Sequence, residues 1–507
     1  MKDLGASFFA SVERQPEALA IVDGDVRLSY AEWQDKILRL VQGLRDIGLE
    51  HGDHLVVALR NRWEMATLHW ACQISGIIVT PVNWRAKAGE IDFYLENSEG
   101  RALVFEPVTA EAVAGSKQAT DIPRIAIGGA QGGTTSFETL IQSDPAAMVS
   151  ACKGEDISLM FYTSGTTGNP KGVPRKHSAE RTASIAHIAQ NLYCYGERAL
   201  GVMPLYHTMG VRSLVAMSLI NGTFVCLPEF SSEVALGLIE DYAVTNLYLV
   251  PTLFHALLSD PKFSAERVKT VRKIGFAGAA MTDGLLAQVN DAFKPDLFVN
   301  HYGSSEIYTF TICPDAVGKP GSAGKSGINQ QIRVVRLDAK EPDELASVGE
   351  EGQIIANLNN EEAFEGYWRR PDADAKGLRS GWYFTGDTGY QDEDGDLFVT
   401  GRVDDMIITG GENVSPGDIE SVLSLHPCVN DVAIVGLPDE KWGQIVTAFI
   451  ERSAPVEKDA LDAHCKASNL ANYKRPRAYV FVTQLPKSPV GKLLRRMLKT
   501  GDYEIEI

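Results

Sequence analysis

The chain has 507 residues, 44% hydrophobic and 22% charged, which is typical of a globular protein and excludes a disordered or low-complexity chain. At about 100–200 residues per domain, this length predicts two to four domains. The 48 basic and 66 acidic residues give a net charge of −18, which argues against a protein that binds nucleic acid through a basic face.

The cysteines and the apolar segments of the sequence bear on the cellular compartment in which the protein is expected. The seven cysteines include no CxxC pair, so they predict reduced thiols and neither a disulfide framework nor a zinc site. The first residues carry acidic groups and no sustained apolar segment, unlike a signal peptide. The longest apolar stretch, 214–227, is interrupted by Asn221-Gly222 and is shorter than the ~20 residues that a membrane span needs. We therefore expect a cytoplasmic protein without a membrane span.

The first part of the chain alternates between strand-like and helix-like segments. Residues 55–59 predict a buried strand, 64–75 an amphipathic helix and 76–82 a second strand, which together form a β-α-β unit of a parallel sheet. The same rhythm predicts further strands at 157–161, 199–202, 223–227, 246–250 and 273–276. The expected fold class is α/β, with a large N-terminal domain of packed βα sheets and no fixed-period repeat.

The pattern changes after about residue 320. Short alternating strands are predicted at 332–337, 352–356 and 396–400, separated by glycines and by acidic turns such as 392–395. They predict antiparallel hairpins in a small barrel-like subdomain. Beyond a turn at 401–405, a small α+β domain is expected, with elements at 419–425, 429–435, 447–450 and 458–471. We place the domain boundary between residues 403 and 404, giving domains 1–403 and 404–507.

A glycine- and threonine-rich loop, 162–172 (YTSGTTGNPKG), follows the strand predicted at 157–161. Glycines let the backbone turn tightly and direct its amides at an anion, and hydroxyls and an ammonium add donors. Because Lys171 is followed by glycine and preceded by Pro170, the loop is not a Walker A motif. It suits nucleotide phosphates, with a mobile linker as the alternative. The candidate contacts are Thr163, Ser164, Gly165, Thr166, Thr167, Gly168 and Lys171.

This loop resembles the phosphate-binding motif of the adenylate-forming superfamily, which comprises acyl- and aryl-CoA ligases, luciferases and adenylation domains of peptide synthetases. Four further segments resemble the family's motifs in the family's order: 302–306 (YGSSE), 383–387 (YFTGD), 401–405 (GRVDD) and 486–492 (PKSPVGK). The segments VMPLYHTMG, FAGAAM and GRVDDMIITGGENVSP are most similar to benzoate- and halobenzoate-CoA ligases. The resemblance implies that ATP activates a small-molecule carboxylic acid as an acyl-adenylate, which a thiol of coenzyme A then attacks.

The resemblance also implies roles in the first half-reaction. Glu306 would hold Mg²⁺ on the ATP phosphates, because a carboxylate is a hard oxygen ligand. Lys492 would bring its ammonium to the carboxylate and the α-phosphate during adenylation. The implied nucleotide contacts are Tyr302, with an aromatic face for adenine, Asp387 and Arg402 at the ribose, and Ala279, Gly303, Ser304 and Ser305. A core tyrosine at 302 and a structural salt bridge at Arg402 are the alternatives.

For thioester formation, the family resemblance implies that the C-terminal domain rotates about the hinge residue Asp404. One face would present Lys492, and the other would present 410–413 to the pantetheine of coenzyme A. The implied coenzyme A contacts are Arg85, Gly410, Gly411, Trp442, Tyr473, Lys474, Arg475 and Arg477. A solvated turn at 474–477 and a core position for Trp442 are the alternatives.

An apolar acyl pocket is expected beside His207, whose position resembles the family's gate between the carboxylate and the nucleotide. The predicted lining is Thr208, Met209, Gly210, Val250, Phe254, Ala279, Ala280, Gly303, Ile307, Tyr308 and Phe310. These residues suit a flat aromatic ring. Segments 205–210 and 249–254 contain no acidic side chain that could pair with the ammonium group of an amino acid.

Two positions depart from the family pattern, because Ser305 replaces a threonine and Phe384 replaces a basic residue. The lead hypothesis is an AMP- and pyrophosphate-forming ligase of a benzoate-like acid and coenzyme A. Three alternative functions stay open: an enzyme that loads a carrier protein, a medium-chain acyl-CoA synthetase, and a non-catalytic acyl- or nucleotide-binding sensor. A homodimer also stays open.

Overall fold

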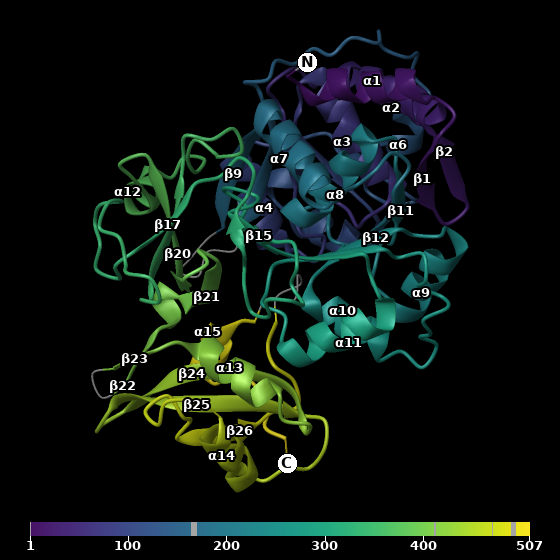
Figure 1. The fold of residues 1–507 in the computed structure, drawn as a ribbon. Coiled ribbons are helices and arrows are strands. Elements are labelled where there is room, and N and C mark those ends of the chain that lie inside the picture. Colours follow the sequence, from purple (N-terminus) through teal and green to yellow (C-terminus); the bar gives the residue numbers. More distant parts are fainter. Residues whose placement is uncertain (1, 164–169, 410–411, 469, 488–492, 507) are drawn as a thin grey trace.

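The computed structural model describes residues 2–163, 170–409, 412–468, 470–487 and 493–506. Two large sheets with their helices form one part of the molecule, a smaller antiparallel sheet lies beside them, and the C-terminal elements form a separate small body (Figure 1). This arrangement confirms the predicted α/β fold class with a large N-terminal and a small C-terminal domain. Among the helices that the structure describes, none is long and apolar enough to cross a membrane.

The first sheet contains the predicted β-α-β unit. Its strands, in spatial order, are β7 (Thr135–Ser136), β6 (Arg124–Ala126), β5 (Ala102–Phe105), β3 (His54–Ala58), β4 (Ile78–Pro81), β8 (Ile157–Thr163) and β9 (Lys171–Lys176). β3 pairs in parallel with β4 and β5, whereas β8 and β9 form an antiparallel hairpin. Every residue of β3 is buried, as the continuous apolar run predicts.

The helix of that unit differs from the prediction. α3 (Trp63–Ser75) is buried on all sides, and the expected amphipathic pattern is wrong. α1 (Leu4–Arg14) and α2 (Tyr30–Asp46) cover it, and Thr67 and Gln73 find hydrogen-bond partners inside the protein. Trp33 Nε1 donates to Thr67 Oγ1 at 2.9 Å, and Ser158 Oγ donates to Gln73 Oε1 at 2.7 Å. These bonds remove the need for a solvated face.

The second sheet confirms the strands predicted between 199 and 276. Its order is β16 (Lys325–Ser326), β15 (Thr311–Cys313), β14 (Leu297–Tyr302), β13 (Lys273–Phe276), β12 (Asn246–Leu249), β10 (Arg198–Gly201), β11 (Thr223–Cys226), β1 (Leu19–Asp23) and β2 (Val26–Ser29). The sheets are covered by α4 (Ala88–Ser98), η1 (Pro107–Thr109), α5 (Ala110–Gly115), η2 (Gln118–Asp121), α6 (Phe137–Leu140), α7 (His177–Gln190), α8 (Thr208–Leu219), α9 (Ser232–Asp241), α10 (Pro251–Leu258) and α11 (Asp283–Phe293).

The predicted hairpins after residue 320 form an antiparallel sheet. It contains β17 (Ile332–Val335), β18 (Gly352–Asn357), β20 (Trp382–Gln391), β19 (Leu378–Arg379) and β21 (Leu397–Arg402), with α12 (Pro371–Gly377) beside it. The C-terminal body contains η3 (Val403–Asp405), β22 (Ile407–Thr409), β23 (Glu412–Val414), α13 (Pro416–Ser424), β24 (Val429–Asp439), β25 (Gly443–Arg452), α14 (Lys458–Ala467), β26 (Ala478–Phe481) and α15 (Arg495–Thr500). α14 ends at Ala467, before the predicted residue 471. At Ser468 the backbone becomes extended, and the Ser468 Oγ donates to the Cys465 carbonyl.

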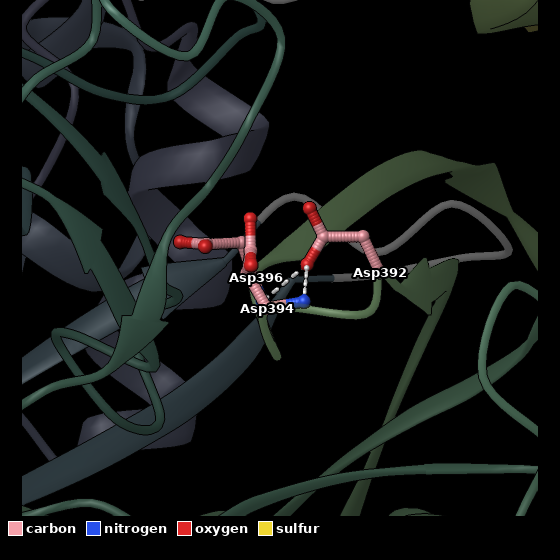
Figure 2. Close-up of side chains that lie close together, drawn as sticks. All are labelled: Asp392, Asp394 and Asp396. Atoms are coloured by element: carbon pink, nitrogen blue, oxygen red, sulfur yellow. Dashed lines mark hydrogen bonds between the residues drawn. The ribbon is translucent and has the colours of Figure 1, made fainter.

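The turn between β20 and β21 carries three aspartates whose carboxylates gather in space (Figure 2). Lys319 Nζ lies 2.6 Å from Asp392, 3.0 Å from Asp394 and 2.7 Å from Asp396. Hydrogen bonding to these carboxylates raises the pKa of the Lys319 ammonium. The cluster therefore fastens the chain before β16 to the turn of the antiparallel sheet.

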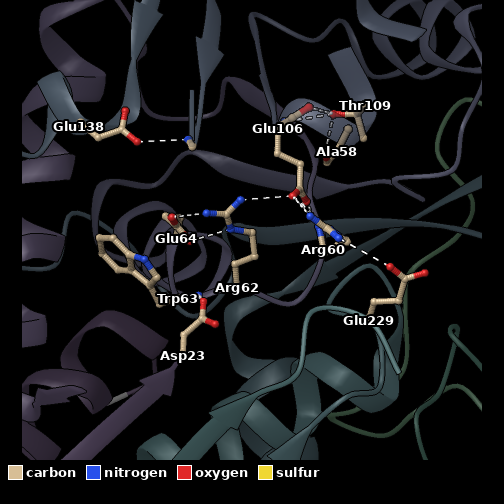
Figure 3. A network of polar contacts seen from close by, with 11 residues as sticks. Asp23, Ala58, Arg60, Arg62, Trp63, Glu64, Glu106, Thr109, Glu138 and Glu229 are labelled. Carbon is tan, nitrogen blue, oxygen red and sulfur yellow. Dashed lines mark hydrogen bonds and ion pairs between the residues drawn. The ribbon is translucent and has the colours of Figure 1, made fainter. Parts of the chain in front are cut away.

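A second charged network ties the carboxyl ends of β3 and β5 to the start of α3 (Figure 3). The fully buried Glu106 accepts hydrogen bonds from Arg60 and Arg62, at 2.8 and 3.2 Å from the two guanidinium groups. Arg62 also pairs with Glu64 at 2.7 Å. Burial alone would raise the pKa of Glu106, but its hydrogen bonds and charge pairing with the two arginines hold it below its ordinary value.

We predict that Glu106→Gln destabilises the first sheet by about 2 kcal/mol at neutral pH, because two guanidinium groups lose a buried anionic partner. The pKa of Glu106 is lowered by folding, so the stabilisation is complete above the ordinary pKa and declines as the pH falls through the lowered one. Melting temperatures of the wild type and the variant, measured from neutral pH down through the lowered pKa of Glu106, check this pH dependence. Glu138→Gln, at an exposed carboxylate bonded to the Gly128 amide, is the matched control. Equal melting temperatures for the two variants at neutral pH would contradict the prediction.

Candidate active site

The glycine- and threonine-rich loop connects β8 to β9, and Thr163 pairs with Lys171 at the base of this hairpin. Ser164, Gly165, Thr166, Thr167 and Gly168 lie outside the described residues. The Lys171 ammonium lies 4.0 Å from the centre of the Tyr367 ring. Burial lowers the pKa of Lys171, Glu306 opposes that shift, and the nearby Arg370 and Arg402 add to it. Several cations thus gather at the base of the loop, which favours an anionic ligand.

Glu306 lies in the tight loop that follows β14. The residue is 6% exposed, and its carboxylate accepts a hydrogen bond of 2.6 Å from the Tyr367 hydroxyl. The loop closes through bonds from the Ser304 amide to the Ile307 carbonyl and from the Phe310 amide to the Tyr302 carbonyl. A Cβ atom at Gly303 would lie 2.0 Å from the Tyr308 carbonyl oxygen, so the loop requires glycine there. Ser305 is partly exposed beside Glu306.

Tyr367 is the residue of this site that the motifs missed. It contacts both Lys171 and Glu306, and its hydroxyl lies 3.3 Å from that of Tyr383. It lies between the segments that resemble family motifs, so only its aromatic character in a polar stretch could have indicated it. Tyr367 links the glycine- and threonine-rich loop to the Glu306 loop.

Asp387 and Arg402 face each other across the pairing of β20 and β21. Arg402 Nη1 lies 2.7 Å from one carboxylate oxygen of Asp387, and the Tyr302 hydroxyl donates to the other at 2.6 Å. Gly386, with φ of +78°, permits this approach, because a Cβ there would lie 2.8 Å from Arg402 Nη2. The salt bridge weighed for Arg402 is therefore present. Burial, and then Asp387, raises the pKa of Tyr302.

The predicted acyl-pocket segments meet at the start of α8. His207 is the N-cap residue of α8, and its Nδ1 accepts from the Met209 amide at 3.4 Å. A Cβ atom at Gly278 would lie 3.3 Å from Val250 Cγ1 and 3.9 Å from Met209 Sδ. Thr208 and Gly210 are buried with Met209, whereas Ala279 and Ala280 are exposed.

The other predicted lining residues belong to different packing clusters. Phe254 shares a buried cluster with Met209 and Val250. Ile307 and Phe310 instead pack with residues of the antiparallel sheet, including Tyr383. The Tyr308 hydroxyl donates to Glu180 at 2.7 Å inside the protein.

The predicted coenzyme A residues lie in two parts of the molecule. The Arg85 guanidinium lies 3.7 Å from the centre of the Trp84 ring and 3.6 Å from Glu229. In the C-terminal body, Lys474 pairs with Asp418 at 2.5 Å and Arg475 with Asp462 at 3.2 Å, while Arg477 is exposed. Trp442 and Tyr473 are each 43% exposed, so the core position weighed for Trp442 is wrong.

Asp404 lies within η3, directly after β21. Lys492, Gly410 and Gly411 lie outside the described residues, so their predicted roles and the domain limits at 403 and 404 stay predictions.

Comparisons with known proteins place this geometry in a family. The model of AMP-binding enzymes matches residues 8–368, and that of the AMP-binding enzyme C-terminal domain matches 418–492. The chain is 34% identical over 499 residues to a 4-chlorobenzoate–CoA ligase of an Arthrobacter species, covering 96% of this chain and 93% of that protein. A long-chain-fatty-acid–CoA ligase of Mycobacterium tuberculosis is 29% identical over 507 residues, with 98% of each chain covered.

A solved structure agrees over nearly the whole length. The o-succinylbenzoate CoA synthetase of Bacillus subtilis, in complex with its acyl-adenylate intermediate, superposes with a TM-score of 0.83 and 27% identity over 97% of each chain. The match of the AMP-binding model to more than half of the chain confirms the resemblance that the motifs indicate. The chain therefore belongs to the AMP-binding enzymes of the adenylate-forming superfamily.

Proposed function

We propose that the protein joins a benzoate-like aromatic acid to coenzyme A in two steps, forming an acyl-adenylate and then a thioester. The coarser statement, an AMP-forming acid–thiol ligase, follows from its family and from relatives named as CoA ligases. The observation that carries the proposal is the meeting of Lys171 and Glu306 at Tyr367.

In the first step, a carboxylate oxygen attacks the α-phosphorus of ATP, and the bond from that phosphorus to the bridging oxygen breaks to release pyrophosphate. This step brings anions together, so it needs fixed positive charge. Lys171, which lies close enough to interact with both Glu306 and Arg402, provides such charge, and we assign Lys492 to the reacting carboxylate and α-phosphate. Arg402 and Tyr302 hold the Asp387 carboxylate, an acceptor group that we assign to the ribose hydroxyls.

The donor set at Glu306 fits Mg²⁺ carried by the nucleotide. Glu306 offers a carboxylate oxygen in a nearly buried position, and Mg²⁺ prefers one or two carboxylates together with substrate phosphates. When bound, Mg²⁺ would offset the charge of the phosphates. Tyr367 would orient the carboxylate through its 2.6 Å hydrogen bond.

In the second step, the thiol sulfur of coenzyme A attacks the acyl carbon and AMP leaves. We assign Asp404 as the hinge for a rotation that replaces Lys492 with Gly410 and Gly411 at the reacting centre. Arg85, Lys474 and Arg475 each contact a carboxylate, and we propose that phosphates of coenzyme A exchange for these partners.

The choice of an aromatic acid rests on the apolar segments that meet near His207. Met209 and Val250 both lie beside Gly278, where an added side chain would contact them, so this wall is apolar. An uncharged planar ring suits such a wall. A relative named for 4-chlorobenzoate supports this choice, whereas one named for long-chain fatty acids defines the competing substrate class.

We predict that pyrophosphate release from ATP and Mg²⁺ is fastest with benzoates in a panel that also contains cinnamates and alkanoates, and that coenzyme A stimulates it. Release and thioester formation are measured for each acid with and without coenzyme A. A preference for alkanoates would contradict the aromatic assignment. Release that ignores coenzyme A would contradict the thioester step and favour a carrier-protein acceptor.

We predict that Lys492→Ala slows acyl-adenylate formation by about 100-fold, because the reacting oxygens lose a cation, but slows the reaction of preformed adenylate with coenzyme A much less. Each half-reaction is measured in single-turnover experiments. Lys269→Ala, at an exposed lysine paired with Glu266, is the control and should leave both rates unchanged. Equal losses in both half-reactions for Lys492→Ala would contradict the alternation about Asp404.

A further inference from the structure

A buried charged network surrounds the Glu306 loop on its interior side. Arg175, from β9, is fully buried, and its Nη1 donates to the Glu306 carbonyl oxygen at 2.8 Å. Its Nε donates to Glu180 on α7 at 2.8 Å. The same Glu180 accepts the Tyr308 hydroxyl at 2.7 Å. The loop is therefore attached to β9 and α7 through both its backbone and a side chain.

A second buried arginine attaches the loop to α8. Arg212 is 2% exposed, and its Nη1 donates to Thr309 Oγ1 at 2.8 Å. Its guanidinium carbon lies 5.0 Å from the centre of the Tyr308 ring, while that of Arg175 lies 4.3 Å from the same ring. Two guanidinium groups thus lie over the side chain that follows Glu306 by two residues.

The cost of burying Arg212 requires an explanation. Within the described ranges, no carboxylate lies within salt-bridge distance of Arg212. Its direct contacts are the Thr309 hydroxyl and the Tyr248 and Tyr308 rings, and the buried Glu362 interacts with it only through longer-range attraction. A buried cation without a carboxylate in direct contact is unfavourable compared with an apolar residue of similar size. The guanidinium supplies a directional contact to the Glu306 loop, which an apolar side chain could not form.

The position of Arg212 on α8 links two parts of the reaction. His207, which caps α8, lies little more than one helical turn before Arg212. We propose that Arg212 is a positioning residue for adenylation, which holds the Glu306 loop at a fixed place relative to the helix that carries His207. This inference rests on the proposed function, in which the carboxylic acid binds beside α8 and the nucleotide binds at the Glu306 loop.

Thr309→Val tests the proposal without removing a charge. The variant keeps the shape of the side chain and deletes the hydroxyl that Arg212 contacts. We expect acyl-adenylate formation to slow by about 10-fold, with a higher concentration of Mg²⁺ needed for half of the maximal rate, because a buried bond to a charged donor is lost. Thr309→Ser restores a hydroxyl and should stay within about twofold of the wild-type rate.

Thr67→Val is the matched control. Thr67 is equally buried and accepts from Trp33 Nε1 at 2.9 Å on α3, so the same substitution deletes a buried hydroxyl in another part of the core. It should lower the melting temperature and leave the adenylation rate and its Mg²⁺ dependence unchanged.

Two outcomes would overturn the proposal while leaving the ligase assignment intact. One is an equal change of adenylation rate in Thr309→Val and Thr67→Val, and the other is a failure of Thr309→Ser to restore the rate. Absence of pyrophosphate release by the wild-type enzyme with every acid would instead overturn the proposed function itself.

Discussion

A charge that a fold buries has to be compensated where it lies, and this requirement organises the molecule around its reaction site. Glu106 is held between Arg60 and Arg62, Asp387 against Arg402, and Glu180 against Arg175. Each pair joins two elements that are neighbours in space, because a lone buried ion is costly. The pairs link the ends of β3 and β5, the strands β20 and β21, and β9 to α7. Asp387 and Arg402 are among the residues assigned to the nucleotide, which would add further negative charge.

The division of charged residues between buried and exposed positions follows the two steps of the chemistry. Asp387, assigned to the nucleotide, lies on a strand and is held in one orientation between Arg402 and Tyr302. Lys474, assigned to coenzyme A, is partly exposed and has a carboxylate partner that a phosphate can replace. Fixed geometry suits a reaction on phosphorus, whereas exchangeable pairing suits a co-substrate that arrives and leaves.

The sequence predicted those elements that depend mainly on the residues within them. The buried run at 55–59 and the strand at 273–276 follow from continuous apolar residues, and both are present as β3 and β13. β20 pairs with β18 as well as with β21, so it depends partly on residues far along the chain, and periodicity did not predict it. The amphipathic interpretation of α3 was wrong because Thr67 and Gln73 find buried partners, which no pattern within the helix can reveal.

The candidate site was predictable to the extent that its residues lie in motifs. Glu306, Asp387 and Arg402 were found in this way, whereas Tyr367 and Arg212 were not, because each acts through contacts to residues far along the chain. Tyr308 shows the opposite case. It was expected in the acyl pocket, but its hydroxyl bonds to Glu180, a contact that depends on how α7 packs against the loop.

The ammonium of Lys319 among three aspartates has a consequence for experiments with metals. Three carboxylates in one turn would ordinarily compete for any divalent cation in solution. Here the Lys319 ammonium contacts all three and offsets part of their charge, so a divalent ion that entered the turn would have to displace it. Occupation of this turn by a metal would therefore release Lys319, and with it the link between the chain before β16 and the antiparallel sheet.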